Sequence, residues 1–415
     1  MAGALPAARS GETTIGSSRV RNLWKRQVCL WLCVAALAGG AGCEEQEGGS
    51  REALAARIAA TPFPRIGMTW APVRGDRSLA SFARHDLIVV GGDQMGLVPD
   101  REPWGLADGF TPESVEAARR WVAEVRRLNP RAVILGDISF YEYGDDALPE
   151  DHPWWLRREG ERRQFWPGTH RMDWYQPEYR AHVVKQTAAM MATGVDGVFY
   201  DNLRQERDPW IAFLTAVRQA IGDQALILAN AGYDVGNYDW VAPYLNGIMY
   251  ESGWSHGRTE WDECIAAMRR TEGLLRQPRI SLIERFEDVR DRAGWPDRPG
   301  LRQPPQPDPA ARRWSLCYAL IVGEYYYAFS DNTSHRHDWH PAYDEKIGLP
   351  LAAGERLGAH LWRRRYQRAL VVVNLPGAAA PAEVVLPAPA HDSLTGERGT
   401  RFVVPPGDGR VLVAE

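Results

Sequence analysis

The sequence predicts an α/β protein, a (β/α)₈ TIM barrel followed by a small antiparallel β-domain. Eight short apolar runs alternate with amphipathic helical stretches between residues 65 and 331. The runs lack the period-two alternation of half-exposed strands, which is typical of parallel strands covered on both faces. After residue 346 short strands broken by glycine and proline take over, with no convincing helix.

The apolar runs and the helices between them follow the order that a barrel requires. Thr111 and Pro112 are typical of a helix start, and Pro130 of a position just past its end. Asp208, Pro209 and a terminal Gly222 predict a second such helix. An open doubly wound sheet is the alternative, although no glycine-rich phosphate turn follows the first run. The predicted strands lie within 65–71, 86–92, 131–139, 194–202, 225–233, 245–253, 279–287 and 317–331.

The N-terminus predicts export. Basic residues precede the apolar run "VCLWLCVAALAGGAG", which is short for a membrane span and ends in small residues before Cys43. This arrangement resembles the signal of bacterial lipoproteins, which implies a lipid on Cys43 and an exported protein anchored in the cell envelope; simple signal cleavage is the alternative. The predicted segments are a signal peptide (1–43), a tether (44–60), the catalytic barrel (61–345) and the β-domain (346–415).

The charge and cysteine content of the chain limit the classes of partner and cofactor that we expect. A formal net charge of −4 with both signs interspersed gives no reason to expect a nucleic acid. Cys264 and Cys317 have no metal-ligand spacing, so we expect buried thiols, with a disulfide between them as the alternative. We expect a monomer that contacts the membrane only through its lipid, and neither a cofactor nor a metal.

Polar side chains end most of the apolar runs. "GVDGVFYDN" (194–202) closes on Asp201 and Asn202, and "LNGIMYESG" (245–253) contains Glu251. Function in a TIM barrel lies at the carboxyl ends of the strands, so we expect these groups to meet in one cleft. Tryptophans in the presumed loops offer flat faces for sugar rings. The predicted substrate-binding residues are Trp70, Asp93, Asp137, Asn202, Asn230, Trp254, Glu284 and Asp331.

Two carboxylates across a cleft suit glycosidic bond cleavage. One must be protonated to release the leaving oxygen, and the other must be ionised to attack the sugar or to activate water. Asp201 and Glu251 end the fourth and sixth runs, so they flank the fifth strand. A separation of about 5 Å predicts retention, and one of about 6.5–9.5 Å predicts inversion.

The ending "VFYDN" resembles the fourth-strand motif of α-galactosidase-type barrels. Over residues 61–415 the chain is more similar to bacterial (β/α)₈ glycoside hydrolases distantly related to the endo-α-1,4-polygalactosaminidases. The resemblance implies a carbohydrate substrate, with Asp201 as nucleophile and Glu251 as acid/base of a retaining enzyme. The α-galactosidase-type barrels carry an aspartate at the second position, so the assignment of the two roles stays open.

Two other functions remain open from the sequence. A barrel that keeps its sugar cleft without turnover would be a carbohydrate-binding protein. The cluster "SHRHDWH", with His335, His337 and His340, offers ligands for a zinc-assisted hydrolase. A solvated loop with one histidine near the substrate is the interpretation that we favour for this cluster.

Overall fold

The computed structural model describes residues 43–415 except 74–75, 204–205, 233–234, 252–260, 287–307 and 331–334. The predicted signal peptide, Trp254 and Asp331 lie outside these described residues, as does the whole of the apolar run before Cys43. The chain divides into two compact units, Met1–Glu52 and Ala53–Glu415, and both the barrel and the β-domain lie in the second. Among the described residues, no helix is both long and apolar enough to cross a bilayer.

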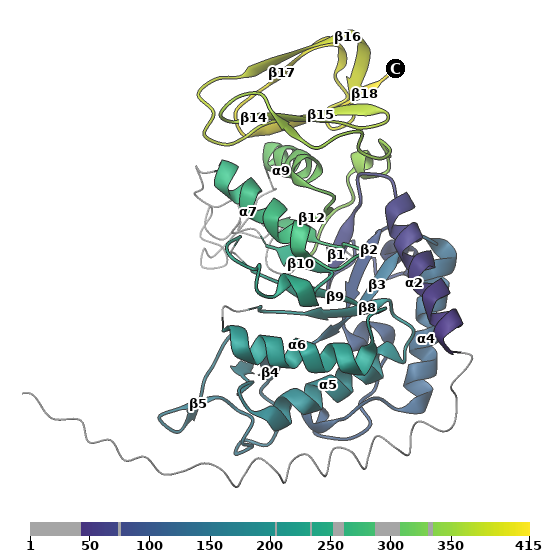
Figure 1. Ribbon diagram of the computed structural model, residues 1–415, viewed down its shortest axis with the longest axis vertical. Coiled ribbons are helices and arrows are strands. Elements are labelled where there is room, and N and C mark those ends of the chain that lie inside the picture. Colours follow the sequence, from purple (N-terminus) through teal and green to yellow (C-terminus); the bar gives the residue numbers. More distant parts are fainter. Residues whose placement is uncertain are drawn as a thin grey trace, which may run out of the picture. The chain divides into compact units, whose positions relative to one another are not determined.

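Eight parallel strands form one sheet in the order β1-β2-β3-β8-β9-β10-β11-β12 (Figure 1). The sheet closes on itself where the Tyr327 backbone N–H donates to the Arg65 carbonyl at 2.9 Å. The predicted TIM barrel is therefore confirmed. Its strands are β1 (Gly67–Thr69), β2 (Leu87–Val90), β3 (Val133–Ile138), β8 (Gly197–Tyr200), β9 (Leu226–Asn230), β10 (Gly247–Tyr250), β11 (Leu282–Phe286) and β12 (Tyr326–Ser330).

Both faces of these strands are buried, which explains their continuous apolar sequences. Alternate residues such as Leu135, Phe199 and Leu228 fill the barrel interior. Their neighbours, such as Ile134 and Val198, join the larger core between the strands and the helices. Gly197 is required by packing, because a Cβ there would lie 2.0 Å from the Leu226 carbonyl oxygen.

The helices surround the sheet (Figure 1). Thr111 is the N-cap and Pro112 the first residue of its helix, as predicted. The helix predicted to have Asp208 as N-cap begins two residues earlier, with Glu206 as N-cap. The first half of the predicted run 317–331 is helical instead, because its apolar residues cover the sheet as a fully buried helix. The helices are α3 (Leu79–Ala83), α4 (Pro112–Leu128), α5 (Pro177–Met191), α6 (Arg207–Ile221), α7 (Trp261–Leu274) and α9 (Pro309–Val322).

The predicted tether is not an extended linker. Residues Cys43–Ala60 form helix α2, and Ile58 near its end is buried in the same cluster as the residues of the barrel interior. The Arg57 guanidinium pairs with Asp196 at 2.6 Å. Within the second compact unit, the end of α2 is therefore part of the folded barrel rather than a spacer.

An insertion with two short antiparallel strand pairs follows the third barrel strand. The sequence did not predict it. The insertion pairs β4 (Glu142–Gly144) with β7 (Thr169–Arg171), and β5 (Arg157–Arg158) with β6 (Glu161–Arg162). These strands are only two or three residues long, too short to show a periodic pattern.

The β-domain is a single antiparallel sheet packed on α9. Arg313 of α9 pairs with Asp408 at 2.7 Å, and the Tyr366 hydroxyl donates to the Leu320 carbonyl at 2.7 Å. Cys264 and Cys317 are free buried thiols, so the disulfide alternative is excluded. The strands are β13 (Glu355–Arg356), β14 (Leu361–Arg365), β15 (Ala369–Asn374), β16 (Ala382–Asp392), β17 (Arg398–Val404) and β18 (Asp408–Ala414).

Candidate active site

Asp201 directly follows β8, and Glu251 directly follows β10, at the carboxyl end of the barrel. Asn230 ends the strand between them and is 3% exposed. The Glu251 backbone N–H donates to the Gly232 carbonyl at 3.0 Å, which ties the sixth strand end to the loop after the fifth. The structure therefore brings together the two carboxylates that the sequence singled out.

Amide groups orient Asp201. The Asn230 side chain donates to Oδ1 at 2.7 Å, and the Asn202 side chain donates to Oδ2 at 2.7 Å. Asn202 adopts a positive φ of 61°, which turns its backbone N–H toward Asp201 Oδ1 at 2.8 Å. Hydrogen bonds from three N–H groups favour the ionised form of a carboxyl. Asn202 and Asn230, predicted to contact substrate, thus hold the Asp201 carboxylate.

Glu251 lies in a different environment. Its side chain is 15% exposed. Burial, together with the nearby charges of Asp201 and Glu284, raises the pKa of Glu251 to about 7, against the opposing effects of His335 and a hydrogen bond from Asn230. At neutral pH this group can therefore hold a proton and also release it, as an acid/base requires.

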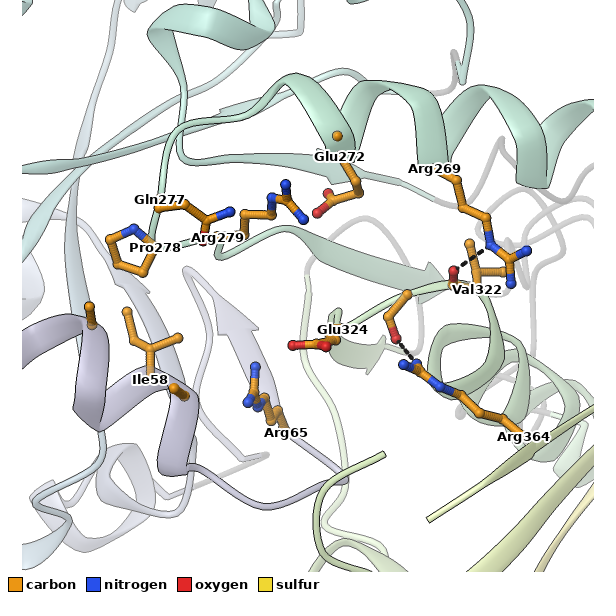
Figure 2. Close-up of a pocket in the computed structure, with 14 residues that line it drawn as sticks. Ile58, Arg65, Arg269, Glu272, Gln277, Pro278, Arg279, Val322, Glu324 and Arg364 are labelled. Atoms are coloured by element: carbon orange, nitrogen blue, oxygen red, sulfur yellow. Dashed lines mark hydrogen bonds between the residues drawn. The ribbon is translucent and has the colours of Figure 1, made fainter. Parts of the chain in front are cut away.

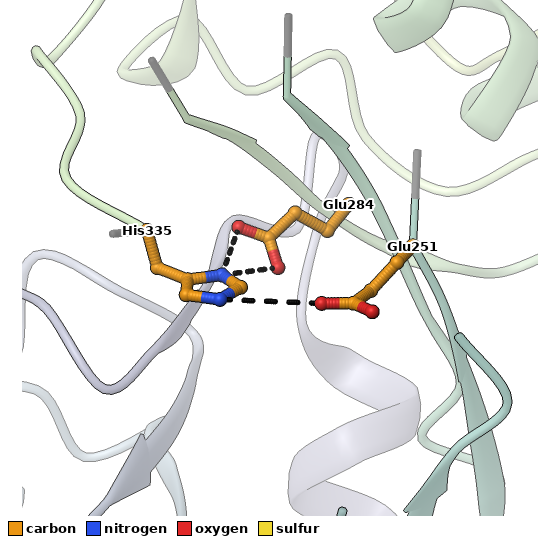
Figure 3. A group of neighbouring side chains, drawn as sticks. All are labelled: Glu251, Glu284 and His335. Atoms are coloured by element: carbon orange, nitrogen blue, oxygen red, sulfur yellow. Dashed lines mark hydrogen bonds and ion pairs between the residues drawn. The ribbon is translucent and has the colours of Figure 1, made fainter. Parts of the chain in front are cut away.

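Glu284 and His335 form a buried pair beside Glu251 (Figure 3). His335 Nδ1 lies 2.9 and 3.0 Å from the two Glu284 oxygens, and its Nε2 lies 4.0 Å from Glu251 Oε1. Thr69 donates to Glu284 at 3.0 Å, and Ser330 also donates to this carboxylate. Burial works to lower the pKa of His335, but the carboxylates of Glu284, Glu251 and Asp201 together outweigh it and the pKa is raised.

Protein donors thus occupy the oxygens of Glu284, which is 1% exposed. Glu284 lies within β11, two residues before its last residue, rather than at the end of the seventh strand as predicted, and its surroundings favour a role in holding His335 rather than direct contact with a substrate. Burial works to raise the pKa of Glu284, but His335 and the hydroxyl donors lower it, so the carboxylate is ionised.

Trp70 and Asp137 form a third group at the mouth. The Trp70 indole N–H donates to Asp137 Oδ2 at 2.8 Å, and its ring centre lies 4.5 Å from that of His335. Asp137 Oδ1 is buried and has no hydrogen-bond partner in the described part of the chain. Burial, opposed by the Trp70 hydrogen bond and reinforced by Asp201 and Asp93, raises the pKa of Asp137 to about 7.

Asp137 opens onto a recess of about 430 Å³ on the side of the second and third strands. Asp93 is exposed at its edge, in a short 3₁₀ helix (η1, Gly92–Met95). Aromatic side chains supply the apolar part of the wall. Among the lining residues are Asp93, Asp137, Ser139, Trp104, Phe110 and Tyr143.

The predicted histidine cluster does not gather around one point. His337 Nε2 lies 2.9 Å from His85 Nε2. His340 is the N-cap of a short 3₁₀ helix, and its side chain accepts a hydrogen bond from the Ala342 backbone N–H. Only His335 of the three reaches the mouth, where it joins Glu251 and Glu284 in the one group of three potential metal ligands found among the described residues. The absence of a metal stays a prediction.

Backbone strain concentrates at this site. The described chain has four residues other than glycine at positive φ, and three of them are Trp70, Asn202 and His335. Such conformations cost about 1–3 kcal/mol each and persist where the surrounding structure fixes them. Thr69 and Ser330 were not predicted as site residues, and no pattern in the sequence marks them. His335 belongs to the cluster in which one histidine was expected near the substrate.

A family model described as "Hypothetical glycosyl hydrolase family 15" matches residues 139–370, more than half of the chain. The chain belongs to this family. The matched region of the family member contains Asp201, Asn230, Glu251, Glu284 and His335. It is thus a glycoside hydrolase barrel that acts on carbohydrate, whereas the resemblance to α-galactosidase-type barrels stays a prediction. No curated protein matches this chain.

Solved barrels of carbohydrate hydrolases have similar folds. The cyclic α-maltosyl-(1→6)-maltose hydrolase from Arthrobacter globiformis is 13% identical, with 87% of this chain and 100% of that chain covered and a TM-score of 0.49. The α-amylase from H. orenii is 12% identical, with 83% and 93% covered and a TM-score of 0.47. The glycoside hydrolase domain of PelA from Pseudomonas aeruginosa is 17% identical, with 65% and 95% covered and a TM-score of 0.41.

Proposed function

We propose that this family member hydrolyses O-glycosidic bonds of a poly- or oligosaccharide with Asp201 as nucleophile and Glu251 as acid/base. The observation that carries the proposal is the position of the two carboxyls, directly after β8 and β10, on either side of β9. The Asn230 amide at the end of β9 donates to Asp201 at 2.7 Å, and the charge of Asp201 helps to raise the pKa of Glu251. Two carboxyls at nearby strand ends, one bound by amide donors and one with a raised pKa, suit cleavage of one sugar linkage.

We also propose retention of anomeric configuration. The resemblance of the "VFYDN" ending to barrels with an aspartate nucleophile supports it. A carboxyl separation of about 5–5.5 Å is typical of retaining enzymes, and one of about 6.5–9.5 Å is typical of inverting enzymes. Inversion would need room for a water molecule between the sugar and the carboxylate.

The different surroundings of the two carboxyls assign their roles. Asp201 accepts three N–H donors, which favour the carboxylate form that attacks the anomeric carbon. Glu251, with its raised pKa, gives its proton to the leaving oxygen while the bond to Asp201 forms. In the second step Glu251 takes a proton from water, which attacks the same carbon and breaks the bond to Asp201. The proton balance of Glu251 is thereby restored.

Reducing-end release tests this function. Purified protein incubated with a panel of polysaccharides and aryl glycosides is expected to release reducing ends from at least one of them, and an Asp201→Asn variant is expected not to. Binding of a polysaccharide without release by the unmodified protein would support the alternative of a carbohydrate-binding barrel. Release that requires an added divalent ion would support the metal-assisted alternative.

We further propose that the recess beside Asp137 holds one sugar unit of the substrate. The Asp137 carboxyl, which lines this recess, is then the partner of a sugar hydroxyl, and Trp104 offers an aromatic face in the same wall. Trp70 donates to Asp137 Oδ2 and so orients the carboxyl.

An Asp137→Asn variant is expected to raise KM about tenfold, because its amide would present N–H donors where a hydroxyl needs an acceptor. The effect on kcat should be smaller, since Asp137 does not take part in bond cleavage. Michaelis kinetics on the substrate found in the screen measure this. The exposed carboxylate Asp223, in the segment before β9, supplies the matched control, Asp223→Asn, which should leave KM unchanged. An unchanged KM in Asp137→Asn would remove the recess from the substrate path.

Export and lipid anchoring through Cys43 remain part of the proposal. The basic region and the apolar run before Cys43 support it. In a bacterial host, cells fed labelled palmitate are expected to label the chain, and Cys43→Ser is expected to abolish the label and release the protein from the membrane fraction. Cys264→Ser is the control that should keep the label. Labelling of Cys43→Ser equal to that of the original chain would exclude this anchor.

A further inference from the structure

A second cavity, of about 480 Å³, lies at the opposite end of the barrel from the catalytic carboxylates (Figure 2). Its walls come from segments that precede strands: Arg65 before β1, Arg279 before β11 and Glu324 before β12. Helix α2 covers one side, and α7 and β14 contribute Arg269 and Arg364. Four arginines line this cavity, against two glutamates.

Arg65 is the unusual member of this group. It is 3% exposed, and its guanidinium stacks 4.2 Å from the centre of the Phe63 ring. Nε donates to the Thr61 carbonyl at 3.0 Å, whereas the two terminal nitrogens donate to no group in the described part of the chain. They are also not among the atoms sealed from solvent, so they open onto the cavity, as Figure 2 shows.

The carboxylates of the cavity do not neutralise Arg65. Neither Glu272 nor Glu324 lies within ion-pair distance of the arginines named above, all of which are described residues. Glu324 is exposed at the rim, so water weakens its attraction to the arginines without removing its charge. Burial, opposed by Ser281 and Arg279, raises the pKa of Glu272 to about 7, so this group carries a partial charge at neutral pH.

The other arginines are fixed in place. Arg269 donates to the Val322 carbonyl at 2.9 Å, and Arg364 donates to the Ala352 carbonyl at 2.8 Å and also to Gly323. Carbonyl bonds hold these side chains without removing their positive charge. A buried guanidinium with two free N–H₂ groups, next to further fixed positive charges, matches the geometry of a carboxylate or phosphoryl group.

We propose that this cavity binds a small oxyanion, with Arg65 as its principal ligand and Arg279 as a second one. The site is independent of the proposed catalytic function. The bound anion contacts segments from α2 to β14 and therefore stabilises the folded state through linkage. Its chemistry is that of a phosphate or a carboxylate, and the two probes below distinguish these sources.

Thermal unfolding of the purified protein, titrated with inorganic phosphate or malonate at constant ionic strength, tests the site. We expect a saturable rise in Tm of about 2 °C or more with one of the two anions, and no such rise with chloride. A stronger response to phosphate assigns the site to phosphoryl groups, and one to malonate assigns it to carboxylates. A rise no larger than that in chloride, with both anions, overturns the proposal.

Anion binding to single-residue variants tests whether the anion occupies this cavity. Isothermal titration is expected to show at least tenfold weaker binding to Arg65→Met, and unchanged binding to the exposed control Arg120→Gln. Glu324→Gln removes a like charge from the rim without touching the core, so it is expected to strengthen binding severalfold even if Arg65→Met fails to fold. Unchanged binding in Glu324→Gln, or in a folded Arg65→Met, contradicts the assignment to this cavity. Because no readout uses catalysis, failure here leaves the proposed hydrolase untouched.

Discussion

Asp201→Asn and Glu251→Gln should each lower kcat by about 10³-fold or more while the protein stays folded. Asparagine keeps the shape of Asp201 and its contact with Asn230 but cannot form a glycosyl ester. Glutamine at position 251 cannot give a proton to the leaving oxygen. Rates with the substrate found by reducing-end release, together with Tm values close to that of the original protein, measure both expectations.

Leaving-group chemistry separates the two roles. A Glu251→Ala variant is expected to keep much of its rate on an aryl glycoside, because the phenolate leaving group needs no proton. Azide should accelerate the second step of this variant, because azide needs no general base. Asp201→Ala should show neither the retained rate nor an azide reaction that retains the anomeric configuration. A 2-fluoro sugar is expected to trap an ester on Asp201, visible by mass spectrometry of peptides. A trapped ester on Glu251 would exchange the two roles, and full activity in either conservative variant would end the assignment.

The Asp201–Glu251 pair could be predicted because, in a barrel, the position of a residue along the sequence determines which end of the barrel it occupies. Each buried apolar run must end where the chain meets solvent, so a carboxylate directly after the run, such as Asp201, lies at the mouth. Neighbouring strands then determine which ends meet. The strand order followed from the alternation of strands and helices alone.

The partners of the pair could not be predicted in the same way. His335 lies 51 residues from Glu284, in a loop with no periodic pattern, and only the folded backbone brings the two together. Asn202 was expected to contact substrate, but its positive φ turns it back onto Asp201. The packing at the end of the segment predicted as a tether was not predictable for a related reason, since the burial of Ile58 depends on a barrel interior formed by residues distant in sequence.

Glu284 contributes to the raised pKa of Glu251, the proposed acid. Burial contributes most to this raised pKa, followed by the charges of Asp201 and then Glu284, while His335 and Asn230 act in the opposite direction. As the proposed acid, Glu251 acts in its protonated form, so we expect activity to be lost as pH rises through its pKa of about 7. Any change that lowers this pKa moves the alkaline limb of the pH profile to lower pH.

A Glu284→Gln variant is therefore expected to move the alkaline limb of kcat/KM down by about one pH unit. The variant removes a negative charge that stabilises the protonated form of Glu251. It also removes the partner that keeps His335 charged, and losing the imidazolium charge works in the opposite direction. The effect of Glu284 on Glu251 is the larger of the two, so the net shift is toward lower pH even when His335 becomes neutral.

The pH dependence of kcat/KM for Glu284→Gln, compared with that of the exposed control Glu397→Gln, decides whether Glu284 acts through Glu251. A purely structural role would lower activity equally at every pH and leave both limbs in place. A shift toward higher pH would instead show that the imidazolium of His335 dominates the electrostatics of Glu251. The position of the limb therefore reports how the buried Glu284–His335 pair acts on the proposed acid, independently of how much total activity the variant retains.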